Sequence, residues 1–263
     1  MSARIHPTAI VEDGAQLGDD CEIGAWCHIG KDAVIADRTR LMNNVTVLGH
    51  TEIGADCLVY PYAVLGGPPQ DFKYKGEKTH LRIGNRNILR EQVTMHAGTG
   101  VGRGETRVGD DGFFMVGAHI AHDCIVGNKV TMANHATLGG HSTVGEFAVI
   151  GGLAGVHQHS RVGRHAFIGG ITAVVSDIIP YAIAHGAHAH LDGLNVIGLK
   201  RRGFDRATIK AMRAAYNELF HGEGVFATRL QRVEDAYSDV APVREILDFI
   251  KAGTSRPLCH PHA

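Results

Sequence analysis

Apolar residues recur at every sixth position along most of the chain. The six-residue step from Ile5 meets an apolar residue each time as far as Leu65, and it does so again without a break from Val108 to Val174. The position four residues later is nearly always small, and Gly often follows the apolar residue directly. Neither the 3.6-residue period of a helix nor the alternation of a single strand explains this spacing.

A period of six is typical of a solenoid that repeats one short strand and one tight turn. Three units would close a triangular coil of about 18 residues, and successive coils would stack about 4.8 Å apart through strand hydrogen bonds. Gly and Asn are expected to supply the turn conformations that other residues resist. The pattern therefore predicts a mainly β protein, with a parallel β-helix over residues 1–190 that is interrupted by loops near 67–80 and 97–107.

The sixfold pattern ends after Pro180. Residues 186–195 are rich in His and Gly, and we expect them to form a linker. Helical spacing follows over 204–220, with Asp205 as the expected N-cap, and two more helices are predicted. The chain is thus expected to end in a small α-helical domain over 191–263, which would cap the open end of the solenoid. The two later helices are expected over 225–237 and 243–252.

Composition and charge narrow the class of protein. Glycine accounts for 34 of 263 residues, about twice the usual share of roughly 7%, without a collagen-like period. The net charge of -1 gives no reason to expect binding to nucleic acid or a membrane surface. No apolar run approaches the roughly 20 residues of a transmembrane segment, and the N-terminus lacks the features of a signal peptide. We therefore expect a cytoplasmic protein.

Four of the five cysteines fall on the small inward position of the repeat, where other repeats have Ala or Ser. Their spacing resembles a metal-binding pattern only because the repeat has that period, so we interpret them as core residues. Cys259, in the C-terminal tail, lies outside the pattern. The four inward cysteines are Cys21, Cys27, Cys57 and Cys124.

Histidine offers the first candidate chemistry. Position within the coil places His122, His141, His157 and His159 at one corner over three successive coils, where they are expected to point outward. They could form a solvated face, a metal site completed by a neighbouring subunit as in gamma-class carbonic anhydrases, or an acid–base site. His122 is the best candidate for a general base, because a carboxylate such as the adjacent Asp123 can fix the imidazole tautomer and stabilise its protonated form.

Two polar segments are further candidates for binding. The first interruption of the solenoid contains Gln70, Asp71 and Lys73, and the second carries His96 at its base. Loops on a rigid scaffold concentrate binding residues, although tolerated insertions would look the same. The basic run 200–202 suits phosphate recognition through forked hydrogen bonds, with an ordinary charged helix face as the alternative.

Five motifs in this chain, HPTAIVEDGA, PPQDFKY, AHIAHDCIVGN, GVHQH and GLKRRGF, resemble the UDP-N-acetylglucosamine O-acyltransferases of the hexapeptide-repeat acyltransferase family. The resemblance runs from Ile5 to about Tyr216. It implies a left-handed parallel β-helix with a C-terminal helical domain, in a cytoplasmic homotrimer whose active sites lie between adjacent subunits. It also implies transfer of a 3-hydroxyacyl chain from acyl carrier protein to the glucosamine 3-hydroxyl of UDP-GlcNAc, the first step of lipid A biosynthesis, with no cofactor or metal.

The resemblance assigns roles to individual residues. His122 would be the general base with Asp123 as its partner, and the N–H of Gly140 would stabilise the oxyanion. Gly170 matches the position that sets the length of the acyl groove, so a myristoyl-length chain is expected rather than a decanoyl one. The other implied substrate-binding residues are Gln70, Asp71 and Lys73 for the sugar, His96, His119, His141, His157, Gln158 and His188 in the cleft, and Asn195, Arg201 and Arg202 of the neighbouring subunit for the nucleotide.

Some positions depart from the family pattern, and they leave open whether the acceptor carries a 3-hydroxyl or a 3-amino group. The N-acyltransferase of the same pathway has an extra N-terminal domain, whereas the repeats here begin at Ile5. Acetyl-CoA-dependent hexapeptide transferases lack the GLKRRGF segment, and a scaffold without activity would need no histidine corner. Basic residues over 200–213, with Arg229 and Arg232, are candidate contacts for an acidic carrier protein. The departures are Pro68, Pro69, Gly117, Ile197 and His159.

Overall fold

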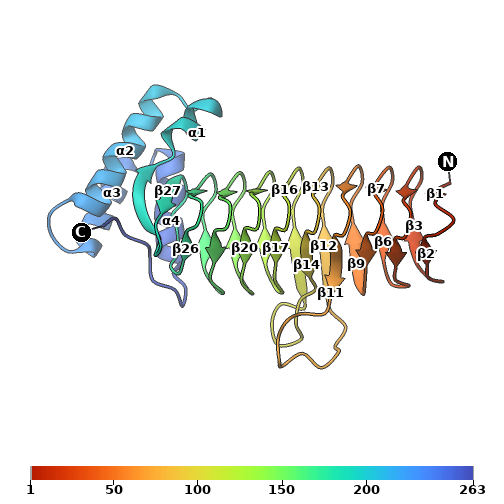
Figure 1. The fold of residues 1–263 in the computed structure, drawn as a ribbon. Helices are drawn as coiled ribbons and strands as arrows, with labels where there is room; N and C mark the ends of the chain where they lie inside the picture. The colour runs from red at the N-terminus through yellow and green to blue at the C-terminus, as the bar shows by residue number, and fades with distance from the viewer. Residues whose placement is uncertain (1, 263) are drawn as a thin grey trace.

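The computed structural model describes residues 2–262, which form a long solenoid of short strands with helices packed at one end (Figure 1). The first sheet contains β1 (Arg4–Ile5), β4 (Glu22–Ile23), β7 (Arg40–Leu41), β10 (Leu58–Val59), β13 (Ile88–Leu89), β16 (Phe113–Phe114), β19 (Thr131–Met132), β22 (Val149–Ile150), β25 (Phe167–Ile168), β27 (Ala182–His185) and β28 (His190–Leu194). The second contains β2 (Ile10–Val11), β5 (His28–Ile29), β8 (Thr46–Val47), β11 (Val64–Gly67), β14 (Thr94–His96), β17 (His119–Ile120), β20 (Thr137–Leu138), β23 (Gly155–Val156) and β26 (Ala173–Val174). The third contains β3 (Gln16–Leu17), β6 (Val34–Ile35), β9 (His50–Ile53), β12 (His80–Ile83), β15 (Glu105–Val108), β18 (Ile125–Val126), β21 (Thr143–Val144) and β24 (Arg161–Val162).

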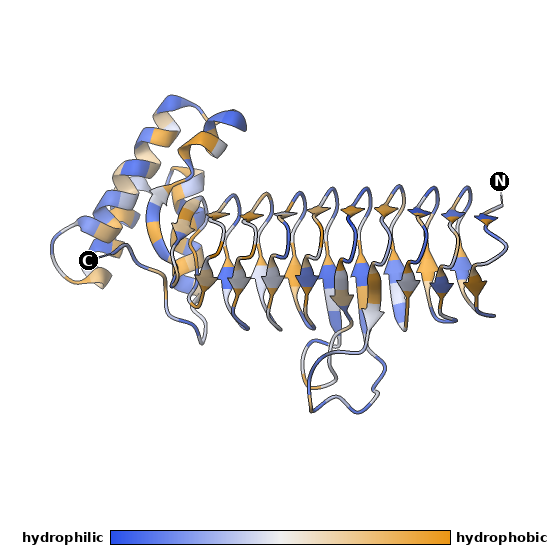
Figure 2. Cartoon of the chain, in the orientation of Figure 1, coloured by the Kyte–Doolittle hydropathy of each residue, from blue (hydrophilic) through white to orange (hydrophobic). Residues whose placement is uncertain are grey.

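The strand register confirms the predicted coil. In the uninterrupted stretches, parallel neighbours pair residues that are 18 apart, as Ile120 does with Leu138, whereas pairs that span a loop are further apart, as Leu58 and Ile88 are. The second residue of each two-residue strand is apolar, and these residues form one continuous core. Figure 2 shows hydrophobic segments recurring from coil to coil along the solenoid. Ile5 is the exception and stays 46% exposed, because β1 forms the open end of the stack in the described residues.

Glycine has a different role from the one predicted. The left-handed conformation at the corners is held largely by other residues, among them Arg38, Asp123 and His141, with φ of 58°, 59° and 62°. The glycine that follows the apolar residue is needed instead because coils approach closely. A Cβ on Gly24 would lie 2.7 Å from the carbonyl carbon of Met42 in the next coil. The prediction that glycine mainly supplies turn conformations is therefore wrong.

The helical region contains four helices in the described chain, α1 (Val196–Arg201), α2 (Arg206–His221), α3 (Phe226–Tyr237) and α4 (Ala241–Ala252). The last three confirm the predicted helices, and the Asp205 side chain caps α2 by accepting the N–H of Thr208 at 2.9 Å. None of these helices, over residues 2–262, is long and apolar enough to cross a membrane.

The predicted linker over 186–195 is wrong for much of its length. β27 adds to the first sheet beside β25, and β28 pairs with β27 as an antiparallel strand. The physical reason is burial, since Ala182, Ala184 and Leu191 point into the core and cover the last coil. The predicted boundary between residues 190 and 191 thus falls at the start of β28.

The helices cap the solenoid, as predicted (Figure 1). The Arg161 guanidinium lies 4.0 Å from the ring centre of Phe249 on α4, and Arg164 pairs with Glu245 at 3.0 Å. The tail beyond α4 then returns to the last coil, where the N–H of Cys259 donates to the Asp177 carbonyl at 2.9 Å. Cys259 is consequently buried, although its position in the sequence gave no sign of it.

Two loops leave the solenoid on the same side (Figure 1). The first, residues 68–79, connects β11 to β12, and the second, residues 97–104, connects β14 to β15. The loops contact each other, since a Cβ on Gly100 would lie 3.2 Å from the side chain of Glu77. Both interruptions therefore enter one region beside the corner that holds His122.

Candidate active site

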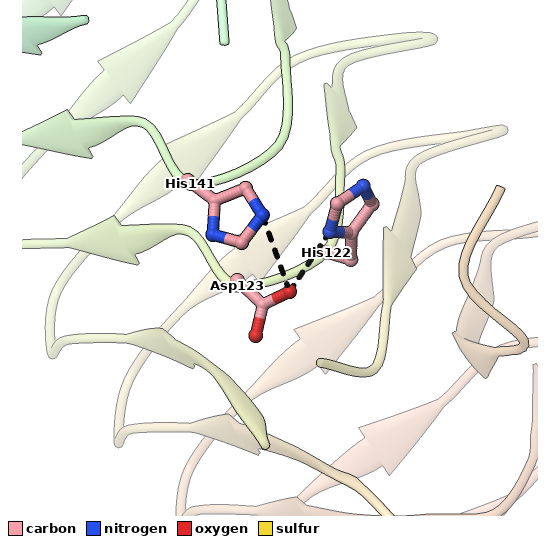
Figure 3. Close-up of side chains that lie close together, drawn as sticks. All are labelled: His122, Asp123 and His141. Carbon is pink, nitrogen blue, oxygen red and sulfur yellow. Dashed lines mark hydrogen bonds and ion pairs between the residues drawn. The ribbon is translucent and has the colours of Figure 1, made fainter. Parts of the chain in front are cut away.

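The corner between the second and third sheets brings His122, Asp123 and His141 together, and we call it the histidine corner (Figure 3). His122 and Asp123 lie between β17 and β18, and His141 occupies the next coil. His122 Nδ1 is 2.8 Å from Asp123 Oδ2. An ionised carboxylate can only accept a hydrogen bond, so Nδ1 carries the proton and Nε2 is left as a free acceptor.

Asp123 is completely buried, and the second loop supplies its hydrogen-bond donors. Its carboxylate accepts the Thr99 hydroxyl at 2.7 Å, the Thr99 N–H at 3.1 Å and the Arg103 N–H at 2.7 Å. Its own N–H donates to the Thr106 hydroxyl at 2.8 Å. Burial alone would raise the pKa of Asp123, but the hydrogen bonds from Thr99, His122 and Arg103 outweigh burial and lower the pKa below its usual value.

Thr99 and Arg103 were missed by reasoning from the sequence, although the loop carried a signal. The segment GTGVGRGE alternates glycine with other residues, which is a sign of close backbone approach. A Cβ on Gly102 would lie 2.5 Å from the Asp123 carboxyl carbon. The second loop therefore packs around the Asp123 carboxylate and supplies hydrogen bonds to it. His96, at the base of this loop, was the only one of its residues that the sequence indicated.

Gly140 lies beside the edge of the His122 ring that carries Nε2. A Cβ there would be 2.6 Å from His122 Nε2. At the equivalent position of the corner between the third and first sheets, the N–H of Asn85 donates to Asp110 Oδ1 at 2.7 Å. The N–H of Asp110 in turn donates to Asn128 Oδ1 at 2.8 Å. Among the described residues the structure gives the Gly140 N–H no such acceptor, so this donor is available to a ligand.

The other histidines of the corner differ in exposure. His122 points out of the core into the cleft, as predicted, but it is only 9% exposed and not an exposed residue, and the His141 ring packs against it. His141 stacks on His159 with ring centres 4.5 Å apart. Burial lowers the pKa of His141, so the ring is neutral near pH 7.

Two residues further along the cleft bind the C-terminal tail. His157 and Gln158 are exposed, as predicted. The Arg256 guanidinium donates to His157 Nδ1 at 2.6 Å and to the Gln158 carbonyl at 3.0 Å. Arg256 was missed because nothing in the sequence indicates that the tail returns to a coil about 99 residues earlier.

His96 and His119 form a second, more buried pair. Their ring centres are 5.1 Å apart, and His119 Nδ1 is 2.7 Å from the hydroxyl of Thr94. Burial lowers the pKa of His96 and lowers that of His119 to about 4. Both rings are therefore neutral near pH 7 and add no positive charge beside His122.

An open cleft of about 570 Å³ runs along the second sheet, and its lining includes His119 and His122. Beyond His122 the outward strand positions of the cleft are small, at Thr137, Gly155 and Ala173. A Cβ on Gly155 would meet no atom within 4 Å, so the floor of the cleft is low there. The predicted residues that the chain brings to this cleft are Gln70, His119, His122, Gly140, His157 and Gln158.

Other predicted site residues lie elsewhere in the single chain. Asn195 caps α1 and its side chain donates to the His165 carbonyl at 3.2 Å, while Arg202 donates to the Phe147 carbonyl at 3.3 Å. Phe147 and His165 belong to the corner between the third and first sheets, so these groups cannot converge on His122 within one chain. The other predicted residues outside the set that lines the cleft are His96, His141 and His188, which were expected in the cleft itself, and Asp71, Lys73, Gly170 and Arg201.

The histidine corner fits proton transfer better than metal binding. Ligand atoms of His122, Asp123 and His141 lie within 4.8 Å of one another, as a metal site would require. The Asp123 carboxylate, however, already accepts hydrogen bonds from Thr99, Arg103 and His122 on its two oxygens. A metal would have to displace this buried network, whereas a proton can move at Nε2 without disturbing it.

Comparison with known proteins places the chain among acyltransferases. Residues 177–259 match the family model described as UDP N-acetylglucosamine O-acyltransferase, domain 2, and residues 32–67 match that of bacterial transferase hexapeptide repeats. The chain is 53% identical to the acyl-[acyl-carrier-protein]–UDP-N-acetylglucosamine O-acyltransferase of Caulobacter vibrioides, covering 98% of each chain. It is also 53% identical to that of Azorhizobium caulinodans, covering 98% of this chain and 96% of the relative.

Solved structures with the same arrangement have related names. The UDP-N-acetylglucosamine acyltransferase from Campylobacter jejuni matches with a TM-score of 0.92 and 37% identity, over 99% of this chain and 100% of that one. The enzyme of that name from Francisella novicida matches with a TM-score of 0.94 and 32% identity, over 97% of this chain and 93% of that one.

Proposed function

This chain belongs to the UDP-N-acetylglucosamine O-acyltransferase family, and from that membership we propose how its own residues carry out the reaction. It transfers an acyl chain from acyl carrier protein to UDP-GlcNAc in lipid A biosynthesis. The observation that carries our assignment of the site is the His122–Asp123 pair, whose free Nε2 faces a cleft beside Gly140.

His122 acts as the general base. Its Nε2 takes the proton of the glucosamine 3-hydroxyl while that oxygen attacks the carbonyl carbon of the 3-hydroxyacyl thioester. The Gly140 N–H stabilises the resulting oxyanion. When the intermediate collapses, the carbon–sulfur bond breaks, and the thiolate of the carrier protein receives the proton from the His122 imidazolium. The ester product and the free thiol account for all atoms.

Asp123 makes this proton transfer possible at neutral pH. Its lowered pKa keeps it ionised, so it holds Nδ1–H and stabilises the imidazolium that forms on His122. Neutral His119 and His141 avoid charge repulsion with that imidazolium. The corner therefore contains one group that gains a positive charge and one nearby carboxylate that balances it.

The complete site requires a second copy of the chain. Asn195, Arg201 and Arg202, which we assign to the nucleotide, lie near a different corner from His122. Gln70 lines the cleft from the first loop, and Asp71 and Lys73 continue that loop toward solvent. We assign these three to the acceptor sugar. A homotrimer with clefts between subunits, in the cytoplasm, joins the two sets of residues and stays a prediction.

The acyl chain occupies the low floor of the second sheet and extends toward the cap. Thr137, Gly155 and Ala173 offer small side chains along that path. Gly170 and the exposed Ile171 lie at the corner between the first and second sheets. We assign Gly170 to the far end of the groove, where a neighbouring copy would complete the wall.

The test compares wild-type protein with His122→Ala, using 3-hydroxymyristoyl carrier protein and UDP-GlcNAc. Removing the base should lower kcat by about 10³-fold, within the usual range for general acid–base catalysis. Circular dichroism and sedimentation confirm that the variant is folded and assembled. Wild-type activity that survives the substitution would reject His122 as the base. Transfer only to the 3-amino analogue of the acceptor would instead reject the assigned hydroxyl chemistry.

A further inference from the structure

A second group of histidines lies at the cap, away from the histidine corner. His185 on β27 and His190 on β28 are directly opposite each other in the antiparallel pair, with ring centres 4.6 Å apart. His262, in the C-terminal tail, lies with its ring centre 4.1 Å from that of His190. The carboxylate of Asp192 is 3.8 Å from His185 Nδ1. We propose that these four residues, the cap histidine cluster, bind a divalent transition metal of the zinc class.

The spacing of the rings suits one shared metal ion. Zinc binds imidazole nitrogen at about 2.0–2.1 Å, which holds the centres of two rings on one ion roughly 5 Å apart. The pairs His185–His190 and His190–His262 are already close to that distance. The strand register holds the first two residues in place, and His262 is exposed, so side-chain rotation is enough to bring the third ligand in.

His190 also lacks a partner that a metal would provide. Its Nδ1 is buried and makes no hydrogen bond within the described chain. A buried polar atom without a partner is costly, and most such atoms in proteins are satisfied by another group. Gly186 packs tightly against this ring, because a Cβ there would lie 2.9 Å from His190 Nδ1. The hairpin thus carries a buried ligand atom that no described group satisfies.

The ligand types select the class of metal. Three imidazoles and one carboxylate suit zinc, nickel or copper, whereas magnesium and calcium prefer sites built from oxygen atoms. Asp192 is 63% exposed and has no buried network to lose, unlike Asp123 in the histidine corner. The cap cluster can therefore accept a metal without the disruption that the histidine corner would suffer.

Metal binding here would tie the tail to the hairpin. β28 already contacts the tail through a bridge between Leu191 and Pro261. The hairpin turn contains His188, and Asn195 follows β28 directly, so the metal would stiffen a segment next to two residues that we assign to substrate binding. The expected consequence is greater thermal stability and slower hydrogen exchange over residues 182–195.

The experiment titrates zinc chloride into metal-stripped, full-length protein and measures stoichiometry by calorimetry and the shift in Tm. We expect one zinc per chain and a higher Tm, with no comparable effect of magnesium. His190→Gln and His262→Ala should each weaken zinc binding by at least the roughly 10- to 100-fold that is typical for loss of a supporting partner. His262→Ala alters an exposed residue near the end of the chain, so it tests the site even if His190→Gln disturbs the hairpin.

Two further variants separate this site from other histidines. His28→Ala removes an exposed histidine at the far end of the solenoid and should bind zinc like the wild type. His141→Ala should also keep the cap site, because it alters only the histidine corner. Loss of zinc binding in His141→Ala with retention in His262→Ala would overturn the proposal, as would the absence of stoichiometric binding by the wild type. Neither result depends on acyltransferase activity.

Discussion

Two corners of the same solenoid have nearly the same backbone conformation, but their polar groups are paired at one corner and partly unpaired at the other. At the ladder corner, between the third and first sheets, residues in the left-handed conformation pair from coil to coil, as Arg38 does with Asp56 at 2.7 Å and Arg86 with Asp111 at 2.7 Å. At the histidine corner, Asp123 and His141 adopt the same conformation. There, His122 Nε2 and the Gly140 N–H have no hydrogen-bond partner within residues 2–262.

The difference indicates which feature makes one corner of a repetitive fold a candidate active site. Nearer the cap, the rings of the ladder corner stack on one another, with His165 between Phe147 and Tyr181 at 4.7 and 5.4 Å between ring centres. Burial lowers the pKa of His165 to about 4, so this histidine is a neutral packing residue. His122 differs because its neighbour Asp123 is a buried carboxylate that Thr99 and Arg103 of an inserted loop hold by hydrogen bonds. The repeat supplies the histidine and the carboxylate, and the interruption supplies the groups that hold the carboxylate in place.

Among the substitutions that test this difference between the corners, Asp123→Asn is expected to have the largest effect on kcat. The amide can no longer hold the Nδ1–H tautomer or balance the imidazolium, so kcat should fall on the order of 10³-fold. Asp111→Asn is the matched change at the ladder corner, where an exposed ion pair contributes little, and kcat should stay within about twofold of wild type. Equal losses from the two substitutions, measured by steady-state kinetics, would show that the corners do not differ as described.

A smaller effect is expected from Gly102→Ala. The new methyl group would lie 2.5 Å from the Asp123 carboxyl and push the loop away, which should lower kcat roughly 10- to 100-fold through misplacement of the pair. Gly100→Ala in the same loop meets only the flexible Glu77 side chain and serves as the control. If both variants keep wild-type kcat at unchanged Tm, the loop is not needed to hold Asp123.

The third corner, between the first and second sheets, offers a test of specificity. Gly170→Met places a long side chain where we assign the end of the acyl groove. Each methylene in an apolar site is worth about 10-fold or more in discrimination, so the preferred donor should shift to a shorter chain by at least that factor. Competition between donors of different length gives the ratio directly. An unchanged ratio would place the groove end elsewhere, with the KM for UDP-GlcNAc as the control for the acceptor site.

The smallest effect is expected at the cap, where basic residues line a surface cavity of about 330 Å³. Reversing Arg206 and Lys210 to Glu should raise the KM for the acidic acyl carrier protein by about 10-fold at low salt, with less effect at high salt. The double reversal of Arg38 and Arg40 to Glu, near the other end of the solenoid, makes the same change in net charge and is the control. An unchanged KM in the double variant would reject this surface as the docking site for the carrier.

Much of the fold could be predicted because each repeat depends on local pattern alone. An apolar residue every six positions forces the same face inward in every coil, so the core from Ile23 to Val174 followed directly. The roles of the glycines could not be predicted in this way. Whether Gly24 serves a turn or a close contact depends on where Met42 of the next coil lies, which the spacing of residues does not reveal.

The candidate site could likewise be predicted only where it follows the repeat. The sequence by itself placed His122 beside Asp123 and aligned His141 and His157 with them, because residues one coil apart share a corner. Only the tertiary structure decided that Thr99 and Arg103 hold the carboxylate, that Arg256 binds His157, and that His185, His190 and His262 meet at the cap. Those contacts join segments that follow no repeat, and their distances are set by how loops and tail pack against the solenoid.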